Sequence, residues 1–448
     1  MVLDSLSAAN SYSYTSQTTK DKSKTNNPNA KITIKDPKTG KTYTMTKEQF
    51  IAYLRYIQNK NNTKPADPYD LGEEANGIRT ITEDCVTIST KPGSSAPKDF
   101  YNSPNKYDDF RTNITEDNGL IDEFRQGKRG DCYLLSSIEA IRNTKDGQKI
   151  LQKNVQHNPD GSYTITLPGA VLARKHYIDE GHGDKCAITG RYTITKEALE
   201  KAQSQSGKAY SFGDINVILF ELAMEAFKAE VYETNKALGQ KSQEFIAGQL
   251  APGSLDDPLA GGQMYDAIFL LTGQKSDVYD GGKEKRQNCK LYTPGEYGYV
   301  GEEEKRLLGI TANKKTKKED LIEVNNVYNK DSDLQRLLDK YAGKEDQYCI
   351  TVGVRVAKKG PDGSTQAGGG HALTVTKITD KYVEVANPWD TGKRERIPRA
   401  DFEKMAVHLT VTEMSEKKVD KFYDKNVNNT ERKGFLDWLF GTSKKNAA

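Results

Sequence analysis

The chain of 448 residues carries 66 Lys and Arg against 63 Asp and Glu, a formal net charge of +3 at pH 7. Binding to nucleic acid phosphates needs a clear basic excess, so this near balance excludes nucleic acid as an expected partner. The sequence contains no run of about 18 apolar residues, and we expect no transmembrane segment. The length fits roughly three domains of ~150 residues, or one large domain with appendages.

Two features of the sequence bear on the compartment. Residues 1–7 contain neither a basic n-region nor an apolar h-region, so they do not predict a Sec-type signal peptide. The five cysteines are odd in number, widely spaced and without a Cys-x-x-Cys pair, which argues against a disulfide framework or a zinc ribbon. We therefore expect a cytoplasmic protein, or one that is exported without a Sec-type signal peptide.

The N-terminal part of the chain divides by composition into three segments. Residues 1–30 are rich in Ser, Thr, Asn and Lys and predict a disordered segment, with a secretion or anchoring signal as the alternative. Residues 31–62 show two stretches of alternating polarity, a capping box and a helical stripe, which predict a small ββα unit without a robust core of its own. Residues 63–99 hold several prolines and predict a linker, with a candidate strand at 85–88.

Residues 100–415 show the patterns of a large domain, mostly helical in its first half and rich in strands in its second, which is an α+β layout. Apolar stripes predict helices at 132–143, 215–235, 263–272 and 334–341. Alternating polarity predicts strands at 163–167, 191–195, 348–354, 372–376, 382–386 and 407–411. Residues 274–331 are charged and weakly patterned, which indicates an insertion. Residues 416–448 predict a charged tail whose short apolar patch, 435–440, is a docked helix or an amphipathic anchor.

One stretch, residues 126–135, organises this large domain. A glutamine and two glycines lead into an Asp-Cys pair, and an apolar helical stripe starts directly after Cys132. At the first turn of a helix the macrodipole and the unpaired N–H groups favour a thiolate, so Cys132 is a candidate nucleophile. The alternative interpretation is a small buried side chain, because free Cys is among the most buried residue types.

A thiol nucleophile needs a base, and the base needs an orienting group. His371 follows a run of three glycines and opens a predicted strand, and Asn387 ends the next strand within an Asn-Pro-Trp sequence. Two adjacent antiparallel strands would place these side chains together, so that Asn387 orients the imidazole of His371 and Trp389 covers the hydrogen bond. The backbone N–H of Cys132 and the side-chain amide of Gln126 are candidate donors to an oxyanion. Taken singly, Asn-Pro marks a turn and a glycine run marks a loop.

These residues resemble those of the calpain branch of the papain-like cysteine proteases. That family shows a Gln-Gly-x-x-Gly-Asp-Cys-Trp run, a Gly-His-Ala element and an Asn-Pro-Trp element. The corresponding residues here are 126–133, 370–372 and 387–389. The resemblance extends over residues 100–415, and its motifs are specific because each one contains a residue with a separate chemical role.

The resemblance implies a papain-like core of two lobes with the catalytic cleft between them. Residues 100–273 would form the helical lobe and residues 332–415 the β lobe, with the insertion at 274–331 between the two. It also implies four roles, which are the nucleophile for Cys132, the general acid and base for His371, the orienting group for Asn387 and an oxyanion donor for Gln126.

The sequence departs from the family pattern at some positions. Tyr133 stands where the family has tryptophan. The family core also binds calcium through scattered acidic groups, one of them three residues before the oxyanion glutamine. Glu123 holds that position and is a candidate calcium ligand, with a surface carboxylate as the favoured alternative, and no EF-hand loop occurs. His176 and His182 flank an acidic loop before Cys186, where a metal site is the less favoured interpretation.

The resemblance implies a cysteine endopeptidase that hydrolyses protein or peptide substrates through a thioester acyl-enzyme. This chemistry requires no cofactor, and the resemblance leaves calcium dependence and self-cleavage open. One alternative is a transglutaminase-like acyl transferase, which usually has Asp as its third member, so Asn387 favours the protease. The other alternative is a catalytically inactive, calpain-like interaction module, and the complete set of four residues argues against it.

Overall fold

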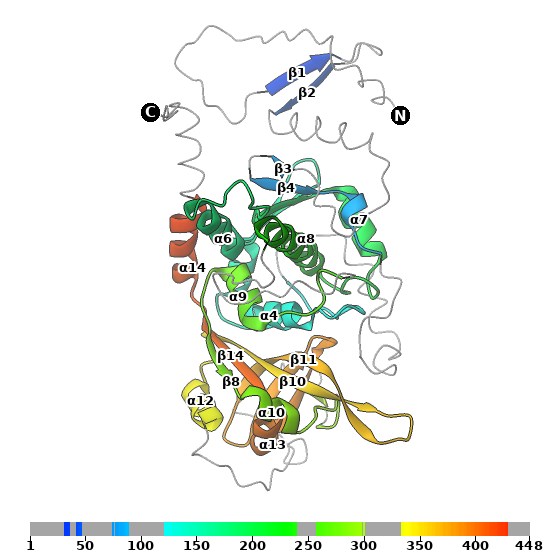
Figure 1. The fold of residues 1–448 in the computed structure, drawn as a ribbon, viewed down its shortest axis with the longest axis vertical. Helices are drawn as coiled ribbons and strands as arrows, with labels where there is room; N and C mark the ends of the chain where they lie inside the picture. Colours follow the sequence, from blue (N-terminus) through cyan, green and yellow to red (C-terminus); the bar gives the residue numbers. More distant parts are fainter. Residues whose placement is uncertain are drawn as a thin grey trace, which may run out of the picture. The chain divides into compact units, whose positions relative to one another are not determined.

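The computed structural model describes residues 31–35, 42–46, 74–75, 77–88, 121–239, 257–297, 299–300 and 333–428. The chain divides into two compact units. They are Met1–Ala66 with Asn158–Gly161, and Asp67–His157 with Ser162–Ala448. All candidate site residues lie in the second unit, which contains both helices and sheets and has a mixed α+β architecture (Figure 1).

Within Met1–Ala66 the described residues form an antiparallel pair of strands, β1 (Lys31–Lys35) and β2 (Thr42–Thr46). Both strands alternate β-branched, aromatic or other apolar residues with polar ones, which is typical of a strand with one buried face. They confirm the two strands of the predicted ββα unit. The helix of that unit and residues 1–30 lie outside the described residues.

The first part of the second unit is mainly helical (Figure 1). Its helices are α4 (Cys132–Arg142), α5 (Gly147–Gln152), α6 (Pro168–Asp179), α7 (Lys196–Ser204), α8 (Ile215–Leu238) and α9 (Met264–Thr272). The side chain of Asp214 caps α8 by accepting a hydrogen bond from the N–H of Asn216 at 2.7 Å. Gly239 ends α8 in the left-handed region, with φ of 66°. These caps confirm the long helix that the apolar stripe predicts.

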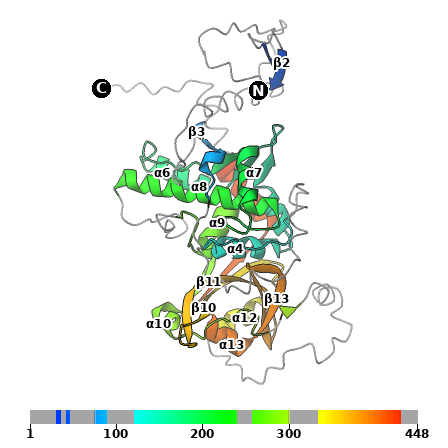
Figure 2. The same cartoon turned by 90° about the vertical axis from the view of Figure 1, so that its right-hand side faces the viewer.

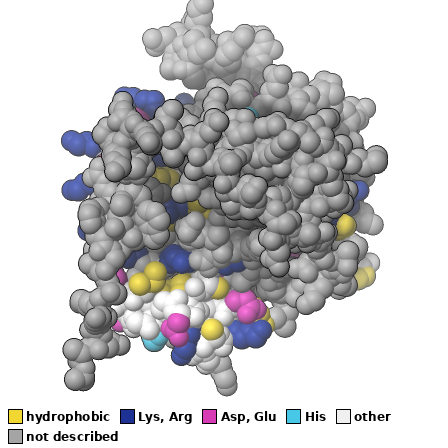
Figure 3. All heavy atoms as spheres, turned by 90° about the horizontal axis from the view of Figure 1, so that it is seen from above, with side chains coloured by type: hydrophobic (Ala, Val, Ile, Leu, Met, Phe, Trp, Pro, Cys, Tyr) yellow, Lys and Arg dark blue, Asp and Glu magenta, His cyan; other side chains and the backbone are white. Residues whose placement is uncertain are grey.

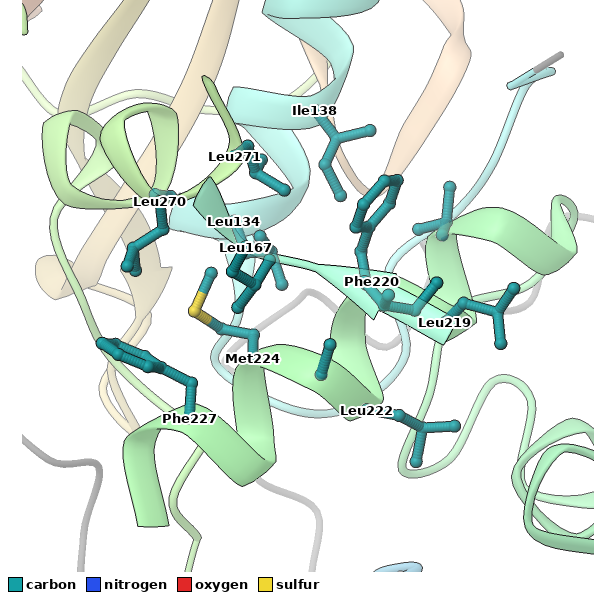
Figure 4. Close-up of a cluster of buried hydrophobic side chains, with 14 of the residues drawn as sticks. Leu134, Ile138, Leu167, Leu219, Phe220, Leu222, Met224, Phe227, Leu270 and Leu271 are labelled. Atoms are coloured by element: carbon teal, nitrogen blue, oxygen red, sulfur yellow. The ribbon is translucent and has the colours of Figure 1, made fainter. Parts of the chain in front are cut away.

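The predicted apolar stripes form the core of this helical part. Side chains from α4, α8 and α9 point toward one another, among them Leu134, Ile138, Phe220, Met224 and Leu270 (Figure 4). All five are fully buried. Burying side chains of this size contributes about 1.5–3 kcal/mol each, so this packing fixes α4 and with it the position of its first residue.

A five-stranded sheet lies within the same helical part. In the order β3-β4-β7-β6-β5 its strands are β3 (Glu74–Ala75), β4 (Ile78–Ile81), β7 (Arg191–Ile194), β6 (Tyr163–Thr166) and β5 (Val155–His157). The linker prediction is wrong for residues 74–88, and the predicted strand at 85–88 is wrong too, because a 3-10 helix covers Glu83–Cys85. The segment is held in the unit because Ile81 and Val86 join the core and Arg79 pairs with the buried Glu230.

The second part of the second unit is a seven-stranded antiparallel sheet (Figures 1 and 2). Its order is β8-β14-β10-β11-β12-β13-β9. The strands are β8 (Asp277–Asp280), β9 (Tyr299–Val300), β10 (Tyr348–Lys359), β11 (Thr365–Ile378), β12 (Tyr382–Asn387), β13 (Asp390–Pro398) and β14 (His408–Glu413). In the described part of this region three helices accompany them, α10 (Gly282–Asn288), α12 (Asp333–Tyr341) and α13 (Arg399–Met405). Val352, Leu373 and Phe402 belong to the core of this sheet.

Two segments are more ordered than the sequence predicts. The described residues of the predicted insertion supply β8 and β9, which form the two edges of the seven-stranded sheet. These residues are therefore not a loop, and their being an insertion stays a prediction. The predicted charged tail begins with α14 (Glu416–Tyr423) and a π-helical turn, Asp424–Asn428. Val419 and Tyr423 stand four residues apart on α14 and join the core of the helical part. The apolar patch at 435–440 lies outside the described residues.

Helix α4 connects the helical part to the seven-stranded sheet, because it packs on α8 and α9 and also contacts β10 and β11 (Figure 2). The hydroxyl of Thr374 on β11 donates to the carbonyl of Ser136 on α4 at 2.7 Å. Arg394 on β13 pairs with Glu139 on α4 at 2.7 Å, and both side chains are buried. These bonds hold α4 against the seven-stranded sheet, whose strands β11 and β12 carry His371 and Asn387.

The surface of the described residues mixes charges of both signs. Lys or Arg and Asp or Glu side chains lie next to one another on the visible described surface in Figure 3, as expected from 66 basic and 63 acidic residues. Within the described ranges, no helix combines the length and the apolar character that a membrane span needs.

Candidate active site

Cys132 is the first residue of α4 and follows the N-cap residue Asp131. Its side chain is half-buried. Burial raises the pKa of the Cys132 thiol to about 12, and the charge of Asp131 acts in the same direction, whereas the backbone N–H groups of Ala372 and Tyr133 lower that pKa. In this arrangement Cys132 is a neutral thiol with N–H donors around it. It therefore forms a thiolate only when a nearby group accepts its proton.

His371 and Asn387 meet through the pairing of β11 with β12. These strands are antiparallel, and Thr374 lies opposite Ala386. The Nε2 atom of His371 and the Oδ1 atom of Asn387 are 2.9 Å apart, a hydrogen-bond distance in a buried environment. The Trp389 ring stacks on the imidazole, with 4.0 Å between the ring centroids, so it covers this bond from one side. The structure therefore brings the predicted base, the predicted orienting group and the predicted cover together.

The hydrogen bonds around Asn387 determine which tautomer of His371 is present. The backbone N–H of Trp389 donates to an Asn387 side-chain atom at 2.9 Å, and a backbone N–H can only donate, so that atom is the amide oxygen. The same oxygen faces Nε2 of His371 and accepts its hydrogen. A neutral imidazole carries one hydrogen, so Nδ1 is left as the acceptor. The site thus presents a base at Nδ1.

The His371 imidazole is neutral in this structure. Burial lowers the pKa of His371 to about 4, although the hydrogen bond to Asn387 acts in the opposite direction. Cys132 and His371 are therefore a thiol and a neutral imidazole rather than an ion pair. To become charged, the Cys132 thiol must lose a proton and the His371 imidazole must gain one. A single proton transfer between them therefore produces both charged forms.

Helix α4 and strand β11 bring Cys132 and His371 to the same junction. The Cys132 thiol lies at the backbone N–H of Ala372, the residue that follows His371. The two side chains form no direct hydrogen bond in the part of the chain that the structure describes. General acid–base contacts are often long without substrate and tighten when it binds, so this geometry is compatible with proton transfer between the two groups.

Gln126 lies beside the loop that carries Asn387. Its backbone N–H donates to the carbonyl of Pro388 at 2.8 Å, and its side-chain nitrogen donates to the carbonyl of Arg129 at 2.6 Å. An amide nitrogen has two hydrogens, so one hydrogen remains for another acceptor. The structure therefore places Gln126 at the junction, and its role as an oxyanion donor stays a prediction.

A group of buried charged residues lies behind Cys132, and the sequence analysis does not predict it. Arg129 is buried and pairs with Glu225 at 2.8 Å and with Asp257 at 2.5 Å. Asp131 lies beside the buried Glu221, and burial raises the pKa values of both carboxyls, that of Asp131 to about 6. The sequence of α8 does indicate this group, because charged side chains occur within its apolar stripe at positions i, i+4 and i+7.

Tyr133 packs against a glycine turn. A Cβ atom added to Gly262 would lie 2.5 Å from the Tyr133 ring, so only glycine fits at this position. Lys228 of α8 stands over the same ring, with 5.0 Å between Nζ and the ring centroid, and it donates to the carbonyl of Gly261. The backbone N–H of Gly261 donates to the carbonyl of Gly130 at 2.9 Å. The turn is therefore fixed beside the start of α4.

Glu123, the candidate calcium ligand, has one carboxyl oxygen 2.8 Å from the position that a Cβ atom of Gly392 would take, and Asp390 is next to the same point. Within the described residues, no three or more His, Cys, Asp or Glu side chains are grouped to hold a metal ion. The described residues therefore provide no group of ligands for calcium at Glu123, or for a metal ion at the histidines near Cys186.

Comparisons with known proteins do not name a relative. No protein-family model matches the chain. A search of curated proteins finds no match either. The chemistry of the site is therefore argued from its own residues and their geometry.

Proposed function

We propose that the chain is a cysteine endopeptidase with a papain-like, two-lobed core of the calpain type. Cys132 is the nucleophile, His371 the general acid and base, and Asn387 the orienting group. The observation that carries this proposal is the directed hydrogen bond from His371 Nε2 to Asn387 Oδ1, 2.9 Å long and covered by Trp389, next to a cysteine at the start of a helix. Each group meets a separate requirement of thiol catalysis.

The first half of the reaction forms a thioester. The Cys132 proton moves to Nδ1 of His371, and the sulfur attacks the carbonyl carbon of the scissile peptide bond. The N–H of Cys132, which has no intrahelical partner at the first position of α4, and the remaining amide hydrogen of Gln126 stabilise the oxyanion. The carbon–nitrogen bond then breaks, and the proton on Nδ1 passes to the leaving amine.

The second half of the reaction hydrolyses the thioester. Nδ1 of His371 takes a proton from a water molecule, whose oxygen attacks the thioester carbonyl. The carbon–sulfur bond breaks, the carboxylic acid product leaves, and the proton on Nδ1 returns to the Cys132 sulfur. Asn387 accepts the Nε2 hydrogen throughout, so the imidazolium intermediate keeps its partner. The substrates are proteins or peptides.

The test uses the full chain, a labelled epoxide or iodoacetamide warhead, and casein as substrate, with and without calcium. We expect labelling at Cys132 and cleavage of casein by the wild type. Cys132→Ala removes both. The matched control is Cys289→Ser, which removes another thiol that is not fully buried and lies outside the site, and it leaves both intact.

Each contrary result has a different meaning. Cleavage by the Cys132→Ala chain would assign the activity to another residue. A wild type that neither labels nor cleaves, with or without calcium, would favour the inactive interaction module. Incorporation of a primary amine into casein in place of hydrolysis would favour a transglutaminase-like acyl transferase, because the same thioester would then react with an amine.

A further inference from the structure

Tyr292 lies between α10 and β9, in the segment that the sequence marks as an insertion. Its backbone N–H donates to the carbonyl of Arg355 at 2.8 Å, and its carbonyl accepts from the N–H of Ala357 at 2.9 Å. Arg355 and Ala357 flank the irregularity at which the pairing of β10 with β11 changes register. Two main-chain bonds on one strand therefore fix the backbone of Tyr292 beside the sheet.

The side chain of Tyr292 reaches Asn387 from the side opposite His371. Nδ2 of Asn387 donates to the Tyr292 hydroxyl oxygen at 3.1 Å, and the hydroxyl donates to Oε1 of Glu395 at 2.5 Å. Tyr292 is fully buried and Glu395 is only 1% exposed. Asn387 and Tyr292 are 95 residues apart in the sequence, so only the folded sheet brings them together.

The direction of each hydrogen bond in this chain is forced. The N–H of Trp389 defines the oxygen of the Asn387 amide, so the nitrogen of that amide faces Tyr292. The Tyr292 oxygen must accept from this nitrogen, which turns the hydroxyl hydrogen toward Glu395. Glu395 is the end of the chain because its carboxyl oxygen accepts that hydrogen.

We propose that Tyr292 and Glu395 are positioning residues of the active site, which hold the Asn387 amide in the one orientation that keeps Nδ1 of His371 available as the base. The kinetic consequences of this inference rest on the proposed function. Its structural consequence, the tautomer of His371, does not depend on that function. Neither residue contacts the reacting atoms, and both act through Asn387.

Removal of the Tyr292 hydroxyl has a defined effect. Nδ2 of Asn387 loses an acceptor, and rotation of the amide, which brings Nδ2 toward Nε2 of His371, becomes less unfavourable. A donor in that place favours the tautomer with hydrogen on Nδ1, and it repels the imidazolium. The base is then absent in a fraction of the molecules, and the imidazolium form loses its proton at a lower pH.

The experiment compares Tyr292→Phe with the matched control Tyr297→Phe. Tyr297 lies in the same segment, is mostly buried and also donates its hydroxyl hydrogen to a carboxylate, that of Asp401 at 3.2 Å. We expect Tyr292→Phe to lower kcat about five- to tenfold, the effect of one lost hydrogen bond. KM changes less, and the acid limb of the kcat/KM profile, where His371 becomes protonated, shifts to lower pH. The Tyr297→Phe chain keeps the wild-type profile.

A second set of variants keeps the proposal testable if Tyr292→Phe does not fold. Glu395→Leu removes the acceptor of the Tyr292 hydroxyl and lowers kcat in the same way. Glu395→Gln retains an acceptor oxygen, so it recovers most of the kcat that Glu395→Leu loses. In an Asn387→Ala background, Tyr292→Phe has no further effect on kcat, because the residue through which it acts is gone. If Tyr292→Phe lowered kcat by the same factor in the Asn387→Ala background as in the wild type, the proposal would be overturned.

Nitrogen NMR of the His371 ring separates this inference from the proposed function. The chain has five histidines, and the loss of one resonance in His371→Ala assigns the signal. We expect the Nε2–H tautomer in the wild type and a larger Nδ1–H fraction in Tyr292→Phe, even if the wild type cleaves nothing. An unchanged tautomer in Tyr292→Phe would overturn the inference and leave the proposed function standing.

Discussion

The two sides of the candidate site are stabilised in different ways. On the sheet side, hydrogen bonds run in one direction from Trp389 and His371 through Asn387 and Tyr292 to a single carboxyl. On the helix side, buried charges surround the start of α4 and the Tyr133 hydroxyl is buried without a hydrogen-bond partner within the described residues. One side is defined by the geometry of its bonds, and the other by the balance of its charges.

If the proposed function holds, this difference indicates how each catalytic group is prepared. A base must hold its hydrogen on the correct nitrogen, which is a matter of orientation, and a chain of directed bonds supplies it. A nucleophile must lose a proton, which is a matter of local electrostatic potential, and buried ionisable groups set that potential. Burial lowers the pKa of Lys228 to about 7 and raises that of Asp266 to about 7, so charges on the helix side change near neutral pH.

The largest expected effect is on the helix side. Arg129→Met removes the buried cation that pairs with Glu225 and Asp257 and leaves two carboxylates without that positive charge. We expect a loss of about 3–5 kcal/mol in the free energy of unfolding, measured by urea denaturation. The control Arg286→Met breaks an exposed pair with Asp280 and costs less than about 1 kcal/mol. Equal losses in the two variants would show that burial does not distinguish these pairs.

A second effect belongs to the sheet side and depends on pH. Burial raises the pKa of Glu395 from 4.5 to about 7, so the folded chain binds one more proton than the unfolded chain between these values. The stability from this group is fully present below pH 4.5 and falls as the pH rises through 7, by at most about 3 kcal/mol. Thermal unfolding from pH 4.5 to 8 should show this slope in the wild type and lack it in Glu395→Gln. Parallel curves would contradict the assignment.

The third prediction concerns the charge next to Cys132. Asp131 raises the pKa of the Cys132 thiol, so Asp131→Asn should lower that pKa. The rate of alkylation by iodoacetamide, followed against pH, measures it. Cys289 in the same chain is the internal control, and its profile stays unchanged. A rise in the pKa of Cys132 would contradict the electrostatic role given to Asp131.

The smallest expected effect is at the junction between the two sides. Thr374→Val removes the hydrogen bond from β11 to the carbonyl of Ser136 on α4, which is 2.7 Å long and buried. We expect a loss of about 1 kcal/mol in the free energy of unfolding. The control Thr193→Val removes a hydroxyl that contacts Thr164 within the five-stranded sheet, away from the junction. Only Thr374→Val should also slow the labelling of Cys132.

The sequence predicts elements well where one apolar face is buried. Helices α8 and α9 begin within two residues of their predicted starts, because their stripes pack into one core. Strand β13 is not predicted, because many of its buried residues are charged. Arg394 pairs with Glu139, and Arg396 with Glu384, so this strand is stabilised by partners that are distant in the sequence. A hydropathy pattern does not show such partners.

The candidate site shows the same contrast between residues that the sequence predicts and residues that it does not. Cys132, His371 and Asn387 are predicted from short motifs, and the structure brings His371 and Asn387 into contact. Tyr292 is a single tyrosine in a weakly patterned segment, and its role depends on where that segment docks. Glu221 is missed because a charged residue within a helical stripe predicts an exposed face unless its buried partner is known. Residues that act through others are visible only in the folded chain.

The hydrogen that identifies the Asn387 oxygen belongs to the main chain of residue 389, not to its side chain. Replacement of the indole by other residues would remove the cover over the imidazole and still leave the amide orientation defined. Proline is the exception, since it has no backbone N–H. The two contributions of this position can therefore vary independently during evolution, and related chains without tryptophan here can retain the same histidine tautomer.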